Sequence, residues 1–228
     1  MKMTDIEKQV GDFRLRIPQL QLEDGCIHGL IGGNGCGKTT LAKLMMGILT
    51  PDSGRIDREG LTGREITMTS QRPYLMHTSV YENVVYPLKL RGEKPEESDI
   101  RPWLTRCGLW KKKDQYAGSL SGGERQKLSM IRAMILKPKF IIVDETLSNL
   151  DPDSVKLFEQ WIREIQEQSA VTWVLISHQL SHIYRMSDQI HFLSQGELVV
   201  SGPARELLKN CGEERLRAFL DRESLDRT

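Results

Sequence analysis

Hydrophobic and polar positions along the chain predict strands and a helix near the N-terminus. Apolar residues alternate with polar ones over residues 13–17, and a continuous apolar run follows over residues 27–31. Both patterns predict strands. Glycines come next, and over residues 39–49 the apolar positions recur at helical spacing. This order predicts a strand, a glycine-rich loop and a helix in direct succession.

The same alternation returns in the C-terminal half. Residues 140–143 and 171–177 are largely apolar and of strand length, and the amphipathic stretch 153–168 between them predicts a helix. Residues 189–193 predict a further strand, and the tail over residues 204–228 has apolar residues at helical spacing, which predicts one or two short packed helices. Strands that alternate with helices predict an α/β fold with a mostly parallel sheet.

Between these two parts, residues 75–136 are dominated by helix-like segments, which the polar linker 92–97 interrupts. We interpret this stretch as a helical insertion. The whole chain of 228 residues, with 39% hydrophobic and 28% charged residues, has the length and composition of about one to two globular domains.

Charge and cysteine content exclude several classes of protein. Lys and Arg total 32 against 31 for Asp and Glu, so the net charge of +1 does not indicate a strongly basic surface for nucleic acid. No apolar run approaches the ~20 residues of a membrane-spanning helix, and residues 1–13 lack the apolar core of a signal peptide. We therefore expect a cytoplasmic chain whose four well-separated cysteines are reduced.

The glycine-rich segment after the second predicted strand matches the phosphate-loop pattern G-x-x-x-x-G-K-[ST]. Its glycines allow consecutive backbone N–H groups to turn toward phosphate oxygens, and the following helix directs its positive end at the same anion. We expect Lys38 to neutralise the β and γ phosphates of ATP and the Thr39 hydroxyl to ligate Mg²⁺. The expected phosphate-binding residues are Gly32, Gly33, Asn34, Gly35, Cys36, Gly37, Lys38, Thr39 and Thr40.

Two acidic residues, Asp144 and Glu145, follow the apolar strand 140–143. Asp144 is expected to hold Mg²⁺ through water, and Glu145 to polarise the attacking water as general base. Because consecutive side chains on a strand point in opposite directions, the two acids are expected to have different roles. The alternative is a solvent-exposed acidic turn after a core strand.

Residues 120–126, with the sequence LSGGERQ, resemble the signature motif of ATP-binding cassette (ABC) proteins. A serine and two glycines that open a helix form a second anion site. The resemblance implies a head-to-tail dimer in which Ser121, Gly122 and Gly123 of one chain close on the γ-phosphate held by the other. A capped helix start is the alternative interpretation.

Other parts of the ABC pattern follow in order along the chain. Gln71 resembles the glutamine that reaches Mg²⁺ and the attacking water, Asp151 ends a loop that resembles the one crossing the dimer interface, and His178 matches the histidine that contacts the γ-phosphate. The resemblance implies a single domain over residues 1–228. Its P-loop NTPase core, with a small N-terminal antiparallel β part, would comprise residues 1–74 and 137–228, and its helical signature subdomain residues 75–136.

Three positions depart from the family pattern. Val10 occupies the place where family members usually stack adenine on an aromatic ring, which predicts weak base selectivity. Phe13 could substitute, but its alternation with apolar neighbours favours a core position. Glu124 and Thr146 stand where a glutamine and a proline are usual, and we expect neither change to abolish activity.

The resemblance implies an ATPase subunit that powers a membrane transporter, most simply a solute importer. Residues 74–84 look like the matching stretch of importer subunits, including those for oxyanions such as tungstate or molybdate. The implied partners are a second copy or a paired ABC subunit, transmembrane permease subunits and a solute-binding protein, with no nucleic acid. The chain would then lie on the inner face of the cell membrane, anchored through the permease. Candidate permease contacts, with ordinary packing as the alternative, are Tyr74, Leu75, Met76 and Tyr81.

Three other functions stay open at this point. An exporter subunit is the nearest rival. A soluble ABC ATPase of DNA repair, chromosome handling or translation would usually carry a long coiled coil between the two halves of its site, or two cassettes in one chain. Residues 40–120 leave no room for such a coiled coil, and the chain has one phosphate loop. A P-loop kinase would not explain the motif at residues 120–126.

Overall fold

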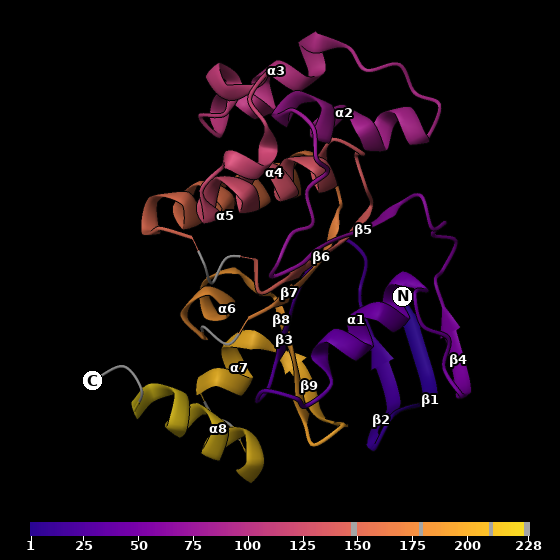
Figure 1. Ribbon diagram of the computed structural model, residues 1–228. Helices are drawn as coiled ribbons and strands as arrows, with labels where there is room; N and C mark the ends of the chain where they lie inside the picture. Colours follow the sequence, from indigo (N-terminus) through magenta and orange to yellow (C-terminus); the bar gives the residue numbers. More distant parts are fainter. Residues whose placement is uncertain (147–149, 178–179, 210–211, 226–228) are drawn as a thin grey trace.

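A computed structural model of the chain describes residues 1–146, 150–177, 180–209 and 212–225 (Figure 1). The strands are β1 Lys2–Val10, β2 Phe13–Gln21, β3 Ile27–Ile31, β4 Ser53–Asp57, β5 Ile66–Thr69, β6 Phe140–Asp144, β7 Thr172–Ile176, β8 Gln189–Ser194 and β9 Glu197–Pro203. The helices are α1 Lys38–Met46, α2 Val80–Leu90, α3 Glu97–Arg106, η1 Trp110–Lys112, η2 Ala117–Ser119, α4 Gly122–Met134, α5 Pro152–Gln168, α6 Leu180–Met186, α7 Ala204–Lys209 and α8 Glu214–Leu225.

The strands form one sheet in the order β4-β1-β2-β9-β8-β3-β7-β6-β5. From β8 to β5 every neighbouring pair is parallel, whereas β9 runs antiparallel to β8, and β1 runs antiparallel to both β2 and β4. A single parallel pair, Arg16 with Glu197, joins the N-terminal strands to the rest. The predicted α/β fold with a mostly parallel sheet and an N-terminal antiparallel part is confirmed.

Both faces of the parallel strands are covered. On β6, Ile141 and Val143 belong to the larger core cluster together with residues of α4 and α5, while Phe140 and Ile142 belong to a second cluster with residues of α1. Figure 1 shows α1 on one side of the sheet and α5 and α6 on the other. Burial on both faces explains why these strands are continuous apolar runs, and it leaves their carboxyl ends as the place where polar groups gather.

The segment between β5 and β6 contains α2, α3 and α4, in agreement with the predicted helical insertion (Figure 1). Val84, Ile100, Leu104 and Leu128 from these helices pack in the same core cluster as the sheet. The exact bounds of a separate subdomain over residues 75–136 stay a prediction.

Two further findings concern the helices. Helix α1 ends at Met46, earlier than the periodicity predicts, because Gly47 adopts a left-handed conformation with φ of 76° and its N–H donates to the Leu44 carbonyl. In the part of the chain that the structure describes, no helix combines the length and the apolar character needed to cross a bilayer.

Candidate functional site

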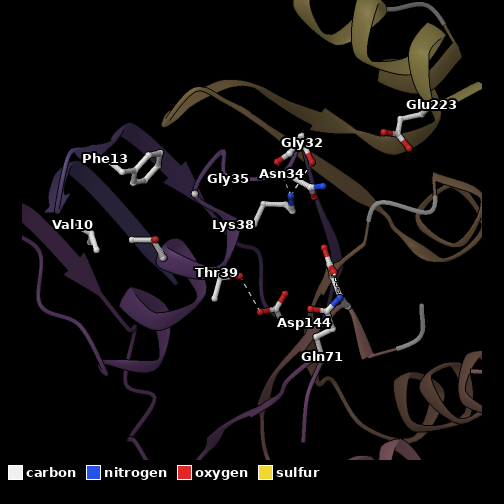
Figure 2. Close-up of a pocket in the computed structure, with 14 residues that line it drawn as sticks. Val10, Phe13, Gly32, Asn34, Gly35, Lys38, Thr39, Gln71, Asp144 and Glu223 are labelled. Carbon is white, nitrogen blue, oxygen red and sulfur yellow. Dashed lines mark hydrogen bonds between the residues drawn. The ribbon is translucent and has the colours of Figure 1, made fainter. Parts of the chain in front are cut away.

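The carboxyl ends of β3 and β6 open onto one cavity of about 990 Å³ (Figure 2). Residues from distant parts of the chain meet there: β1, β2, the loop after β3, the segment after β5, the end of β6, and α8. The lining residues are Val10, Phe13, Gly32, Gly33, Asn34, Gly35, Gly37, Lys38, Thr39, Thr40, Gln71, Asp144, Glu145 and Glu223.

The loop between β3 and α1 needs glycine at two positions. Gly32 has φ of 149°, and a Cβ there would collide with the Leu193 carbonyl oxygen. Gly37 has φ of 111°, and a Cβ there would lie 2.8 Å from Leu15 Cδ1. No described side chain caps the N-terminus of α1, so the first N–H groups of this helix remain available to an anion in the cavity.

The Lys38 side chain donates hydrogen bonds to the main chain of this loop. This side chain is buried, and Nζ donates to the Gly32 carbonyl at 2.8 Å and to the Gly33 carbonyl at 3.0 Å. Cys36 does not line the cavity, because its side chain is buried with Sγ 3.8 Å from Lys38 Nζ. The loop therefore presents backbone N–H groups and one ammonium to the cavity, which suits a polyphosphate.

Thr39 and Asp144 bring two oxygen ligands together below the loop. Thr39 Oγ1 donates to Asp144 Oδ2 at 3.2 Å, and a dashed line marks this hydrogen bond in Figure 2. Burial raises the pKa of Asp144 above its usual value, while the hydrogen bond from Thr39 acts in the opposite direction. A hydroxyl and a carboxylate are hard oxygen donors, so the pair fits a Mg²⁺ ion, which uses few protein ligands and keeps several waters.

Gln71 and Glu145 form the second polar pair of the cavity. Gln71 Nε2 donates to Glu145 Oε2 at 2.9 Å. Glu145 has φ of 49°, a left-handed conformation that is uncommon for a residue other than glycine, and its N–H donates to the Ile176 carbonyl. Strand alternation predicts that Asp144 and Glu145 point to opposite sides. The structure differs because the chain leaves the strand after Asp144, so both carboxylates line the same cavity.

The signature residues lie apart from this cavity. Ser121 caps α4: its Oγ accepts from the Glu124 N–H at 3.3 Å, and its own N–H donates to Glu124 Oε2 at 3.0 Å. Lys112 Nζ donates to Glu124 Oε1 at 2.6 Å, and this hydrogen bond lowers the pKa of Glu124. Ser121, Gly122 and Gly123 are absent from the residues that line the cavity.

Asp151 also lies away from the cavity and caps α5. Its carboxylate accepts from the Ser154 N–H at 2.9 Å and from the Ser154 hydroxyl, which lowers its pKa. A Cβ on Gly123 would lie 4.0 Å from Asp151 Oδ2, so the starts of α4 and α5 are neighbours. The predicted residues thus form two groups within one chain, one around the cavity and one at these helix starts.

The remaining predicted residues differ in outcome. His178 lies outside the described residues. Phe13 packs against the second core cluster, as expected, and also lines the cavity together with the half-exposed Val10. The sequence did not predict Glu223 as a lining residue of the cavity (Figure 2). The apolar spacing of the tail predicts a helix, but nothing in it indicates that Glu223 of α8 faces the phosphate loop.

Comparisons with known proteins agree with this arrangement. A family model described as "ABC transporter" matches residues 15–148. The chain is 34% identical over 194 residues to the tungstate uptake system ATP-binding protein TupC of Peptoclostridium acidaminophilum, covering 82% of this chain and 91% of the relative. It is 34% identical over 198 residues to the Fe(3+) ions import ATP-binding protein FbpC of Pasteurella multocida, covering 82% of this chain but 57% of that relative.

Among solved structures, an ATP-binding subunit of an ABC transporter superposes with a TM-score of 0.84 at 22% identity. The match covers 96% of this chain and 98% of that one. At this level of identity the likeness concerns the fold.

Proposed function

Because this chain belongs to the ABC transporter family of ATP-binding proteins, we propose that it hydrolyses ATP to power the import of a solute through a membrane transporter. One observation supports the chemistry above all. The phosphate loop, the Thr39–Asp144 pair and the Gln71–Glu145 pair line one cavity. This juxtaposition supports a site that binds phosphates, a cation and a water side by side.

In this proposal the loop residues and the start of α1 bind the phosphates of ATP, with Lys38 on the β and γ phosphates and Thr40 at the start of the helix. Thr39 and Gln71 would hold Mg²⁺ directly and Asp144 through a water. When bound, Mg²⁺ supplies neutralisation of the phosphate charge. Glu145 accepts the proton of the attacking water as general base, and Gln71 orients that water and the carboxylate. His178 is assigned to the γ-phosphate on the family resemblance alone.

We propose that the second group of residues acts on the ATP of a second chain. Ser121 caps α4 and Gly122 and Gly123 open its first turn, all outside the cavity, and Asp151 lies next to Gly123. A head-to-tail dimer would bring these residues of one chain to the ATP of the other. We propose a homodimer or a pairing with another ABC subunit, in which residues 75–136 act as the signature subdomain against the core of the partner.

A groove of about 350 Å³ is the proposed docking site for the permease. It lies between core residues such as Met46 and Ile66 and helical residues such as Pro87 and Arg132. Tyr74 lines this groove with 77% of its surface exposed, whereas Leu75 and Tyr81 pack against the core. An exposed aromatic ring on a groove is a suitable anchor for an apolar partner segment.

Docking at this groove would hold the chain on the inner face of the membrane, and a solute-binding protein would complete the importer. Relatives named for tungstate and for Fe(3+) are equally identical to this chain, at 34%. We therefore assign cargo selection, for an oxyanion or another solute, to the partner subunits.

The test uses Glu145→Gln. We expect this variant to bind MgATP, to form a stable dimer and to hydrolyse at least ~100-fold more slowly, because the general base is removed while the phosphate loop is kept. Light scattering with ATP and a phosphate-release assay measure the two properties. Lys38→Ala is the control, expected to lose nucleotide binding and the ATP-dependent dimer together. A Glu145→Gln variant that stays monomeric in saturating MgATP, or that turns over at the wild-type rate, would contradict the proposal.

A further inference from the structure

The segment that carries Gln71 is held in place by neighbouring helices. Residues 70–78, between β5 and α2, contain no helix or strand. Two side chains of α4 donate to carbonyls of this segment: Gln126 Nε2 to the Gln71 carbonyl, and Arg132 Nη1 to the Tyr74 carbonyl at 2.6 Å. Helix α4 therefore contacts the segment at two points that lie three residues apart.

Gln126 is an unusual residue for its surroundings. It is 3% exposed, and its Oε1 finds no hydrogen-bond partner among the described residues. An unpaired buried amide oxygen is destabilising, and a methionine of similar size would avoid that cost. The contribution of Gln126 therefore lies in its one hydrogen bond, from Nε2 to the main chain of Gln71, rather than in packing.

This bond connects α4 to the hydrolytic pair. The main-chain carbonyl of Gln71 is fixed by Gln126, and the side chain of the same Gln71 donates to Glu145 Oε2 at 2.9 Å. Ser121 caps the start of the same helix α4. A displacement of this helix would thus move the backbone from which the Gln71 side chain reaches Glu145.

We propose that Gln126 is a positioning residue for hydrolysis: through the Gln71 carbonyl it places the Gln71 side chain against Glu145, and it makes this placement depend on the position of α4. The inference rests on the proposed function. It adds a residue that does not line the cavity and acts entirely through Gln71.

A double-mutant cycle tests the inference. We expect Gln126→Met to lower kcat roughly 10- to 100-fold, since misplacement of a catalytic group is costly, while the Kd for ATP changes by less than about twofold. Gln71→Ala should lower kcat by itself. Because Gln126 acts through Gln71, the double variant should be no slower than Gln71→Ala alone.

Leu128→Val on the same helix is the matched control. Leu128 is buried in the core cluster, so this variant should lower the melting temperature with kcat unchanged. Losses in the double variant that equal the product of the two single losses would overturn the inference, as would a Gln126→Met variant with wild-type kcat.

Hydrogen exchange gives a readout that does not depend on ATP hydrolysis. Amides of residues 71–78 should exchange faster in Gln126→Met than in the wild-type chain, and amides of α1 should not. Unchanged exchange overturns the anchoring by Gln126. A wild-type chain without ATPase activity, but with faster exchange in the variant, would overturn the proposed function and the catalytic consequence while leaving the anchor in place.

Discussion

Thr69 and Thr146 form a buried pair close to Gln71 and Glu145 in the sequence. Their hydroxyl oxygens are 2.7 Å apart, and both side chains are almost fully buried. Thr146 follows Glu145 directly and stands where the family pattern has proline. The hydroxyl pair ties the end of β6 to the end of β5, the two strands whose following residues are Glu145 and the Gln71 segment.

Thr146→Val should lower the free energy of unfolding by about 1–3 kcal/mol, because it leaves the Thr69 hydroxyl buried without this partner. The double variant Thr69→Val/Thr146→Val removes both hydroxyls at nearly constant shape and should be close to wild type. Urea unfolding measures both. A double variant less stable than the single one would show that the two hydroxyls do not depend on each other.

We expect Val10 to influence how the nucleotide base binds. Val10 and Phe13 are the apolar lining residues at the β1–β2 side of the cavity, and Val10 is 47% exposed. A small aliphatic side chain offers little stacking area, so we expect the wild-type chain to bind ATP and GTP with affinities within about threefold. Val10→Tyr should tighten both roughly tenfold, since stacking on an aromatic ring tolerates any base. Competitive nucleotide titrations give the four constants, and a strong wild-type preference for ATP would refute the idea.

Among the elements, β1 is a strand whose buried residues an alternating apolar pattern does not predict. Met3 and Ile6 are both buried, although strict alternation would place residues three apart on opposite faces. Asp5 has φ of 49°, and the pairing of β1 with β4 shifts register between Thr4 and Glu7. This bulge resets the alternation in mid-strand, so no period of two is visible in the sequence.

The candidate site could be predicted where its residues are close in sequence. The phosphate loop and the strand that ends in Asp144 depend on local turns and on local apolar patterning, so their residues are recognisable. The approach of Glu223 and the bond from Gln126 to Gln71 depend on how distant elements pack. No local pattern records that packing.

A pair of histidines connects β3 to β8 within the sheet. Because the Glu23 carbonyl can only accept, His28 Nε2 carries a proton toward it. With neutral rings, His191 Nε2–H then donates to His28 Nδ1 at 3.0 Å and the Ser201 hydroxyl to His191 Nδ1. This chain of hydrogen bonds is satisfied when both imidazoles are neutral. Burial lowers the pKa of His28, and it lowers the pKa of His191 to about 3.

These shifts predict a loss of stability in mild acid. Because the folded-state pKa values lie below the ordinary value of 6.5, the unfolded chain binds protons first as pH falls. Stability is full above pH 6.5 and declines below it, by about 2 kcal/mol for His191 alone between pH 7.5 and pH 5. Urea midpoints at these pH values should lie closer together in His191→Gln than in the wild-type chain, and stay as far apart as in the wild type in the exposed-histidine control His77→Gln. An equal pH dependence in wild type and His191→Gln would contradict this.

At the scale of the whole molecule, residues from β1 and from α8 line the same cavity. Val10 comes from the first strand and Glu223 from the last helix. With Asp144 and Glu145, Glu223 brings the lining carboxylates to three against one ammonium, that of Lys38. Asp144 and Glu145 have proposed roles in hydrolysis, whereas Glu223 adds a negative charge to the proposed site for a polyanion.

Glu223→Gln should therefore tighten ATP binding about two- to threefold, the range expected for a partly exposed charge. The gain should shrink at high salt, where charges are screened. Glu206→Gln, an exposed position on α7 outside the cavity, is the control and should change nothing. Titrations with a fluorescent ATP analogue at two salt concentrations test this, and weaker binding in Glu223→Gln would show that the carboxylate assists the nucleotide instead.

The place of β3 in the sheet has a consequence for biosynthesis. The strand that ends in the phosphate loop lies between β7 and β8, with Ile27 beside Trp173 and Ile31 beside Phe192. A nascent chain emerging from the ribosome must therefore release β3 long before either neighbouring strand has been translated. The sheet around the loop, and with it nucleotide binding, can therefore be completed only after β8 has been translated, so ATP can stabilise the folded domain but cannot guide the folding of the residues synthesised before β8.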